Sequence, residues 1–337
     1  MKAFYRESLQ QAWRLAMTNR VLWALAFFAS FLGIAPTFET ILELTPSQGS
    51  LSYSAATAVI SGDFLTSNFF DWSVSFSQIP WASLTIYHLP ILTLLLLMLT
   101  LIILLVVVVI SSEGGLIKAA DYYLKDRKLS YLEAFRHGLD KFWEIFILHF
   151  IFRLIYLVIF AALLVPLAVS AYSFGPGLTL ASQLAVFFIL APTLIVLDIV
   201  VRYSIMYVML EKRPVLQAFD KGWKLFKQNW LISLETAILI FLVLAVFIFA
   251  LILILSLLAV IVVLLATQLP PASLALQLLL MIALVMTLAL VALAMMIFTS
   301  FYLTIWVNIF RRLGREPHYS KIHRSVGHLP ILHKKII

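Results

Sequence analysis

Two long stretches of this chain carry almost none of the charges that a water-soluble fold needs. Residues 21–110 contain no Lys or Arg, and residues 236–310 contain no charged residue at all. Because about 20 apolar residues suffice to cross a hydrocarbon layer of about 30 Å, such runs are typical of transmembrane helices. Charged residues make up only 12% of the chain, against about 25% in soluble domains. We therefore predict an all-α fold, a polytopic membrane helix bundle that forms a single membrane domain over residues 1–337.

The hydrophobic segments predict six transmembrane helices. These lie at residues 21–44, 89–110, 146–169, 179–210, 230–269 and 272–309. Lys and Arg are concentrated before the first segment, after the last, and in residues 112–141 and 212–227. Under the positive-inside rule, these basic segments and both termini face the cytoplasm. The sequence thus predicts a multi-pass protein of the cell membrane with cytoplasmic N- and C-termini.

The net charge of +8 does not indicate a nucleic-acid-binding protein. The basic residues fall in short segments between hydrophobic runs, where anionic lipid headgroups and topology control account for them. The chain has no cysteine, which excludes disulfides, thiolate nucleophiles and Cys-ligated metals. We therefore expect membrane lipids as partners, and no nucleic acid.

Two features of the predicted spans are unusual. The outer loop, residues 45–88, is rich in Ser, Thr and aromatic residues, which indicates short helices lying at the outer interface or, alternatively, a lid that captures a ligand. The last two spans are each about 38 residues, or roughly 57 Å at 1.5 Å per residue. Strong tilt, a bend, or projection beyond the outer leaflet would absorb their excess length.

Three short amphipathic segments, which we call elbows, share one pattern. Each has a helix starter, then an apolar residue, any residue, Gln or Glu, Ala and an aromatic residue; two variable positions, a small residue and an apolar residue follow. The elbows begin Ser8-Leu9-Gln10-Gln11-Ala12-Trp13, Ser130-Tyr131-Leu132-Glu133-Ala134-Phe135 and Pro214-Val215-Leu216-Gln217-Ala218-Phe219. Ser followed three residues later by Glu or Gln is a capping box, and Pro favours a first helical turn, so each elbow is predicted to open a helix.

Each elbow precedes an outgoing span and a return span. We therefore predict three parallel repeats, related by rotation about the membrane normal. Repeat 1 covers residues 1–110, repeat 2 residues 111–210 and repeat 3 residues 211–310, and residues 311–337 form a basic cytoplasmic tail.

The elbows are predicted to lie in the cytoplasmic headgroup region, because each places apolar and aromatic side chains on one stripe and charges on another. Anionic headgroups are the expected ligands. The candidate interfacial residues are Trp13, Phe135, Phe219, Trp223, Lys221, Lys224 and Lys227.

The chain shows a family resemblance in the elbow at 130–138, the similar elbow at 214–222, and the preceding span, which runs into Ala119-Ala120. It resembles the membrane domain of glycerophosphoryl diester phosphodiesterases and the YciC-like bacterial inner-membrane proteins. The resemblance covers most of the chain. It implies a six-helix domain of the bacterial inner membrane with no settled biochemical role. It brings no catalytic residues, because the phosphodiesterase barrel of the fused family members is absent from this sequence.

Charged residues inside the predicted spans are the natural candidates for a functional site, because a charge in hydrocarbon is costly. Two i, i+4 pairs and one further acid lie at similar depths near the cytoplasmic ends of the third to fifth spans, and we predict that they form one polar network. Its members are His149, Arg153, Asp198, Arg202 and Glu235. The network either locks the helices together or lines a vestibule open to the cytoplasm for an anionic headgroup or an ion.

No catalytic triad, metal-binding motif or phosphate loop is present, so we expect no enzyme, no cofactor and no metal site. The four His residues of the tail recur every five residues, a step that matches neither helix nor strand. The first functional hypothesis is a non-enzymatic scaffold of the envelope that binds lipid, a membrane-protein partner or a second copy of itself. The second is a transporter or channel for a small anionic or lipid-like substrate.

Overall fold

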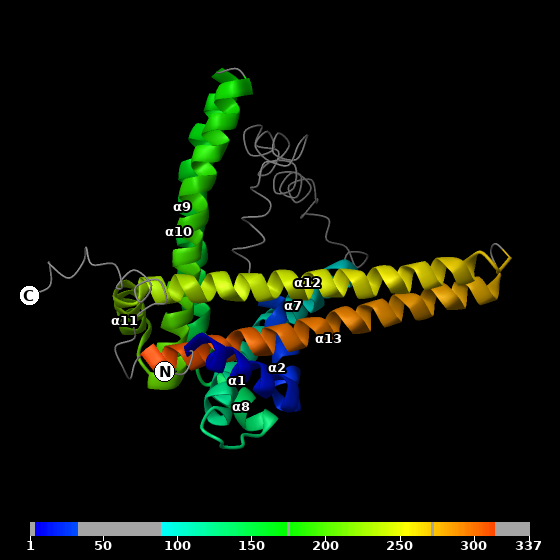
Figure 1. Ribbon diagram of the computed structural model, residues 1–337, viewed down its shortest axis with the longest axis horizontal. Helices are drawn as coiled ribbons and strands as arrows, with labels where there is room; N and C mark the ends of the chain where they lie inside the picture. Colours follow the sequence, from blue (N-terminus) through cyan, green and yellow to red (C-terminus); the bar gives the residue numbers. More distant parts are fainter. Residues whose placement is uncertain (1–3, 33–88, 174–175, 271–272, 314–337) are drawn as a thin grey trace, which may run out of the picture. The chain divides into compact units, whose positions relative to one another are not determined.

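The computed structural model describes residues 4–32, 89–173, 176–270 and 273–313, and these residues are helical with no strand. The predicted outer loop, the end of the first span and residues 314–337 of the basic tail lie outside the described residues, whereas residues 311–313 of that tail are the end of the last helix. In chain order the helices are α1 (Phe4–Thr18), α2 (Arg20–Ala29), η1 (Ser30–Leu32), α7 (Leu89–Tyr123), α8 (Tyr131–Leu139), α9 (Phe142–Ser173), α10 (Pro176–Glu211), α11 (Val215–Gln228), α12 (Trp230–Ala266) and α13 (Leu274–Leu313) (Figure 1).

Five of the described helices are long and apolar enough to cross a membrane: α7, α9, α10, α12 and α13. The α1–α2 pair, which bends by 95°, would make a sixth if it is one broken span. The helical membrane character predicted from the sequence is therefore confirmed.

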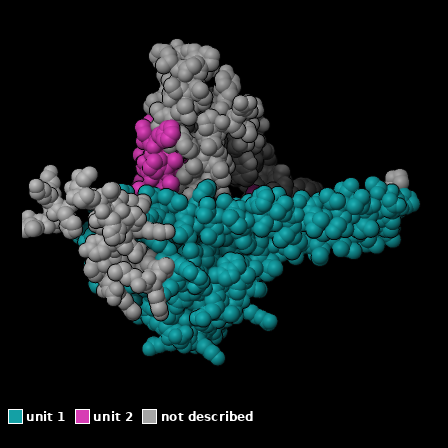
Figure 2. Space-filling model, in the orientation of Figure 1, with its two compact units in different colours: residues 1–34, 108–145, 199–337 teal, residues 35–107, 146–198 magenta. Residues whose placement is uncertain are grey.

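The chain divides into two compact units (Figure 2). The first unit comprises residues 1–34, 108–145 and 199–337, and it holds the short helices, α12, α13 and the last turns of α7 and α10. The second comprises residues 35–107 and 146–198, and so includes most of α9 and the first part of α10. The functional site described below belongs to the first unit alone.

The return span of the first hairpin is longer than predicted. The predicted span ends at Ile110, but α7 continues to Tyr123 and includes Gly114 and Gly115. The two glycines lie where α8 crosses α7, and a Cβ on Gly115 would lie 2.7 Å from the carbonyl oxygen of Ala134. These glycines therefore allow α7 and α8 to pack closely.

The second and third elbows begin as the sequence predicts. The Ser130 hydroxyl accepts a hydrogen bond from the Glu133 backbone N–H, and the Glu133 carboxylate accepts one from the Ser130 N–H, which completes a capping box. Pro214 precedes the first residue of α11 as its N-cap. The first elbow differs: α1 begins at Phe4, so Ser8 is buried inside the helix and does not start it.

The return helices contact one another in the first unit. On α10 and α13, Tyr203 meets Trp306 and Tyr207 meets Phe310, with ring centroids 5.8 Å and 4.9 Å apart, so the two helices run in the same direction. The last part of α7 contacts α10, because a Cβ on Gly114 would lie 3.2 Å from Met209 Sδ. An ion pair joins α7 to α13, as described below.

The two helices of the last hairpin lie side by side (Figure 1), and each changes its surroundings along its length. On α13, no residue between 274 and 293 is buried, whereas every residue from 298 to 310 is. On α12, burial likewise stops after Ile240. We call residues 274–293 the loop-side half of α13 and residues 294–313 its basic-end half. Figure 2 shows the paired loop-side parts of α12 and α13 extending from the rest of the first unit.

Candidate functional site

The packed part of the first unit, which we call the basic-end body, has a polar interior. It consists of α1, α2, α8 and α11 around residues 108–123, 199–211, 230–240 and 294–313. Buried polar and charged side chains in a membrane protein are costly unless they are paired, and they commonly mark a function. The body buries Ser8, Ser111, Ser112, Glu113, Asp121, Arg202, Ser204, Ser233, Thr236, Thr299, Ser300, Thr304 and Asn308.

Arg202 lies at the contact between α10 and α13. Its side chain is 9% exposed, and its guanidinium carbon lies 4.3 Å from the centroid of the Tyr302 ring. A guanidinium over an aromatic face gains a cation–π attraction that is strongest where water is excluded. The neighbouring Tyr203 exchanges a hydrogen bond of 2.8 Å with Ser233 on α12. This turn of α10 therefore connects α12 and α13.

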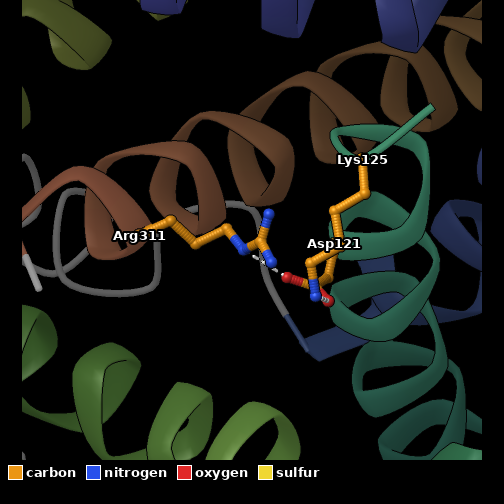
Figure 3. Close-up of polar contacts among 3 residues, drawn as sticks. All are labelled: Asp121, Lys125 and Arg311. Atoms are coloured by element: carbon orange, nitrogen blue, oxygen red, sulfur yellow. Dashed lines mark hydrogen bonds and ion pairs between the residues drawn. The ribbon is translucent and has the colours of Figure 1, made fainter. Parts of the chain in front are cut away.

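Asp121 is the centre of a charged cluster at the basic end (Figure 3). Its side chain is almost fully buried, with Arg311 Nε 2.5 Å from one carboxylate oxygen and Lys125 Nζ 2.8 Å from the other. Because Asp121 is on α7 and Arg311 on α13, their ion pair joins the ends of two return helices, and Lys125 lies in the turn that follows α7. Removing one member of a buried ion pair is usually far more costly than removing an exposed one.

The helix α1 runs antiparallel along α13 through polar contacts. Asn308 Nδ2 donates to Gln11 Oε1 at 3.2 Å, and Arg312 lies 3.7 Å from the Glu7 carboxylate. A separate contact reaches α12, because the Tyr5 hydroxyl donates a short hydrogen bond to Glu235. The first elbow is thus anchored along the return helix of the last hairpin.

Some buried polar atoms of the body have no hydrogen-bond partner among the described residues. They include the hydroxyls of Ser111, Ser112 and Thr299 and the indole nitrogen of Trp306. More than nine-tenths of buried polar groups in proteins are hydrogen-bonded, so each exception calls for an explanation such as a bound water or ion. The hydroxyls lie on α7 and α13, and the Trp306 indole is on α13.

The elbows bury their small residues and expose their large apolar ones. The buried small residues are Ala12, Ala16, Ala134, Gly138, Ala218 and Gly222, and the exposed apolar ones include Trp13, Met17, Leu132, Leu139, Leu216, Phe219 and Trp223. Phe135 is half-buried and stacks on Tyr131. The sequence predicted the apolar stripe of each elbow, and the structure turns most of that stripe outward.

The lysines of α11 border its exposed aromatic stripe. Lys227 Nζ lies 5.5 Å from the centroid of the Trp223 ring, and Lys224 pairs with Asp220 at 2.6 Å. Lys221 is engaged with α10, because it lies 3.3 Å from Glu211 and 5.5 Å from the ring centroid of Tyr207. Lys224 and Lys227 are therefore the lysines best placed to reach a headgroup.

The five charges predicted to form one network divide between the two units. Arg202 and Glu235 belong to the first unit, where they contact Tyr302 and Tyr5. His149, Arg153 and Asp198 belong to the second; His149 and Asp198 are half-buried and Arg153 is exposed. The single five-residue network stays a prediction.

Sequence reasoning missed most of the polar interior. Asp121 and Arg311 lie beyond the predicted span ends, so they were counted only as loop charges. Thr299, Trp306 and Asn308 lie in a predicted span without charges. They were missed because only charged residues inside the spans were considered as candidates for a site. A cluster of polar residues confined to one end of a long apolar span, as at residues 299–308, is the signal that could have found them.

Comparison of the chain with models of known protein families, with curated proteins and with solved structures finds no match. The function of this chain is therefore inferred from the residues and contacts of the basic-end body and the elbows.

Proposed function

We propose that this chain is a non-enzymatic multi-pass protein of the cell membrane that binds anionic lipid headgroups with its elbows. The observation that carries the proposal is the arrangement of α11, where Ala218 and Gly222 are buried while Phe219, Trp223 and two lysines face outward. An exposed stripe of aromatic and cationic side chains is the usual build of a helix that lies in the headgroup layer. Both termini are cytoplasmic in this proposal, as the positive-inside rule predicts.

A threefold repeat is part of the proposal. It is supported by where each elbow docks. The second elbow crosses α7, where a Cβ on Gly138 would overlap the Ser111 carbonyl; the third crosses α10, where a Cβ on Gly222 would lie 2.6 Å from Ser204 Oγ. The first elbow lies on α13. Each elbow thus contacts the return helix of the preceding repeat, and α1 closes the cycle on the last one. This is the pattern expected of parallel repeats around an axis.

Lipid preference tests the proposal directly. The full chain is placed in nanodiscs of equal parts phosphatidylglycerol and phosphatidylcholine, and the lipids that remain bound are identified by native mass spectrometry. We expect enrichment of phosphatidylglycerol, and we expect the double variant Lys224→Gln, Lys227→Gln to lose about 1 kcal/mol of lipid affinity per removed charge.

The matched control removes two exposed cations from the loop after α7, by Arg127→Gln and Lys128→Gln. It should lower the enrichment less than the α11 variant, because these residues lie in a loop and not on the face of a helix beside its outward aromatic side chains. Equal effects of the two double variants, or no preference for the anionic lipid, would show that α11 is not a headgroup site.

A transporter or channel for a small anionic or lipid-like substrate is the second candidate. The buried hydroxyls of Ser111 and Ser112 favour it, because neither has a hydrogen-bond partner among the described residues and such groups often hold a water or an ion. Flux of chloride or phosphate into proteoliposomes tests it. Flux at the level of empty vesicles would exclude this candidate and leave the lipid-binding proposal intact.

A further inference from the structure

A series of hydrogen bonds, which we call the corner link, connects the end of α11 to the interior of the basic-end body. The Asn229 amide Nδ2 donates to the Leu225 carbonyl oxygen at 3.3 Å, and the Asn229 carbonyl oxygen accepts a hydrogen bond from the Ser233 hydroxyl at 2.9 Å. The Ser233 hydroxyl lies 2.8 Å from the Tyr203 hydroxyl on α10. Asn229 is the single residue between α11 and α12, so the link passes through the corner where these two helices meet.

The donors and acceptors fix the direction of the corner link. A Ser hydroxyl has one proton to donate, and Ser233 donates it to the Asn229 carbonyl oxygen. The Tyr203 hydroxyl therefore donates to Ser233. Both Tyr203 and Ser233 are fully buried, and a buried polar group that loses its partner is left with the full cost of desolvation. The two hydroxyls are thus held in this arrangement.

Tyr203 is itself held in place by α13. Its ring meets Trp306 edge to face at 5.8 Å and lies 6.3 Å from the ring of Phe310. Aromatic pairs of this kind stabilise a fold beyond the area that they bury. The next residue of α10, Ser204, lies against the middle of α11, because a Cβ on Gly222 would lie 2.6 Å from its hydroxyl oxygen. One turn of α10 therefore fixes α11 at two points, its middle and its C-terminal corner.

The first elbow has the same residue at its corner but a different link. Asn19 is the single residue between α1 and α2, and its Nδ2 donates to the Leu15 carbonyl oxygen at 3.1 Å, as that of Asn229 does four residues back. The indole of Trp23 on α2 donates to the Ala16 carbonyl oxygen on α1. These bonds stay between the elbow and its own span, whereas the corner link reaches a return helix. The α1–α2 corner is therefore a natural control.

We propose that Tyr203 is a positioning residue for the headgroup-binding helix α11. Through Ser233 and Asn229 it sets the angle between α11 and α12. The proposal rests on the lipid-binding function proposed above, and it names the residue that orients that same site. A helix in the headgroup layer keeps its aromatic and cationic side chains at one depth. Freedom at the corner should therefore weaken lipid binding without the loss of any charge.

The angle at the corner is measured with pairs of spin labels. The chain has no cysteine, so labels attach only to introduced ones. Gln217→Cys with Leu242→Cys spans the α11–α12 corner, and Gln10→Cys with Phe31→Cys spans the α1–α2 corner; all four side chains are exposed. Double electron–electron resonance on the full chain in nanodiscs then gives the distance distribution across each corner.

Two variants break the corner link. Tyr203→Phe removes the hydroxyl and keeps the ring that packs against Trp306, and Ser233→Ala removes the next member. In each we expect a broader distribution across the α11–α12 corner, with the displaced population of α11 raised about fivefold by the loss of one hydrogen bond, and no change at the α1–α2 corner. Thr236→Val is the matched control, because its buried hydroxyl donates to the Ile232 carbonyl within α12 at 2.7 Å. It should leave both distributions unchanged.

Lipid binding is the second readout. In nanodiscs of equal parts phosphatidylglycerol and phosphatidylcholine, Tyr203→Phe should lower the enrichment of phosphatidylglycerol, and Thr236→Val should not. An unchanged α11–α12 corner in both Tyr203→Phe and Ser233→Ala would overturn the proposal, as would a displaced α11 that binds phosphatidylglycerol as well as before. An equal change at both corners would also overturn it, because the variants would then loosen the whole body.

Failure of the lipid-binding function itself gives a different result. The unsubstituted protein would then show no preference for phosphatidylglycerol, while the distances across the α11–α12 corner would still decide whether Tyr203 sets the angle of α11.

Discussion

The two halves of α13 are similar in length but have opposite surroundings. In the loop-side half no residue is buried, whereas in the basic-end half every residue from 298 to 310 is buried. The loop-side half is almost entirely aliphatic, and the basic-end half mixes aromatic residues with Ser, Thr and Asn. A helix in lipid needs no protein neighbours for its apolar surface, since the acyl chains are equally apolar. The difference shows that only one half of this helix depends on tertiary packing.

The comparison also accounts for the length of α13, which at 40 residues is about 60 Å at 1.5 Å per residue. Its loop-side half alone is about 30 Å long, which equals the thickness of the hydrocarbon layer. The basic-end half belongs to the basic-end body, whose surface carries the lysines and arginines. A loop-side half that alone crosses the hydrocarbon layer would need neither the tilt nor the projection beyond the outer leaflet that the sequence predicts, and both stay predictions.

The largest difference between the halves should appear on truncating a phenylalanine. Phe301 is fully buried in the basic-end half and meets Trp13 edge to face at 5.7 Å. We expect Phe301→Ala to lower the free energy of unfolding by about 4 kcal/mol, because it leaves a cavity. SDS titration in mixed micelles measures this. Phe249→Ala on the lipid-facing part of α12, where Phe249 is 63% exposed, should cost less than about 1 kcal/mol; equal costs would contradict the comparison.

A charge placed on the loop-side half should reveal that its surroundings are lipid. Leu284 is 59% exposed, so in water a lysine would be harmless there. In hydrocarbon we expect Leu284→Lys to cost about 3 kcal/mol of apparent insertion free energy, measured by glycosylation mapping in microsomes. Leu216→Lys on α11, at a side chain that is 79% exposed, is the control and should be nearly neutral. A neutral Leu284→Lys would place the loop-side half outside the membrane.

The crossing of α7 and α8 should tolerate no added atom. A Cβ on Gly138 would lie 1.8 Å from the backbone oxygen of Ser111, so the helices have to separate. We expect Gly138→Ala to destabilise the protein by about 2 kcal/mol, seen as a lower midpoint of SDS unfolding. Gly222→Ala should cost less, because the nearest atom is the Ser204 hydroxyl, which can rotate. Ala289→Leu in the loop-side half adds more atoms and should have little effect; a loss equal to that of Gly138→Ala would count against the comparison.

The smallest effect should be a pH dependence at the start of α8. Hydrogen bonds from the Ser130 backbone N–H and hydroxyl lower the pKa of Glu133 below its usual value of 4.5. A carboxylate whose pKa is lower in the folded state stabilises the fold above its unfolded pKa, and this contribution is lost as the pH falls through the folded pKa. We therefore expect the protection of the first turn of α8 against hydrogen exchange, taken relative to the intrinsic exchange rate at each pH, to fall below about pH 4.5.

Glu133→Gln should remove that pH dependence without unfolding α8, since Gln also serves in a capping box. The same acidification should leave the protection of the loop-side half of α13 unchanged, because that half has no ionisable group. Equal protection of α8 at pH 4 and pH 7 would show that its capping carboxylate does not stabilise the first turn of the helix.

The sequence predicted the long helices well but their ends poorly. Hydrophobic runs identify the spans α7, α9, α10, α12 and α13 because lipid selects apolar side chains residue by residue. The end of α7 was misplaced because the apolar run stops at Ile110, whereas the helix continues through Gly114 and Gly115, which pack against α8. Likewise Ser8 resembled a helix start, but the contacts of α1 with α13 extend that helix toward the N-terminus.

The sequence by itself determined that this chain enters a membrane, roughly where it crosses, and which ends of its helices carry the positive charge. These properties depend on whether each side chain is more stable in water or in lipid, so they can be predicted from each segment separately. Only the tertiary structure decided that Asp121 meets Arg311, that Arg202 stacks on Tyr302, and that the elbows turn their aromatic residues outward. Such pairings depend on distances between segments far apart in the chain, which no single hydrophobic run encodes.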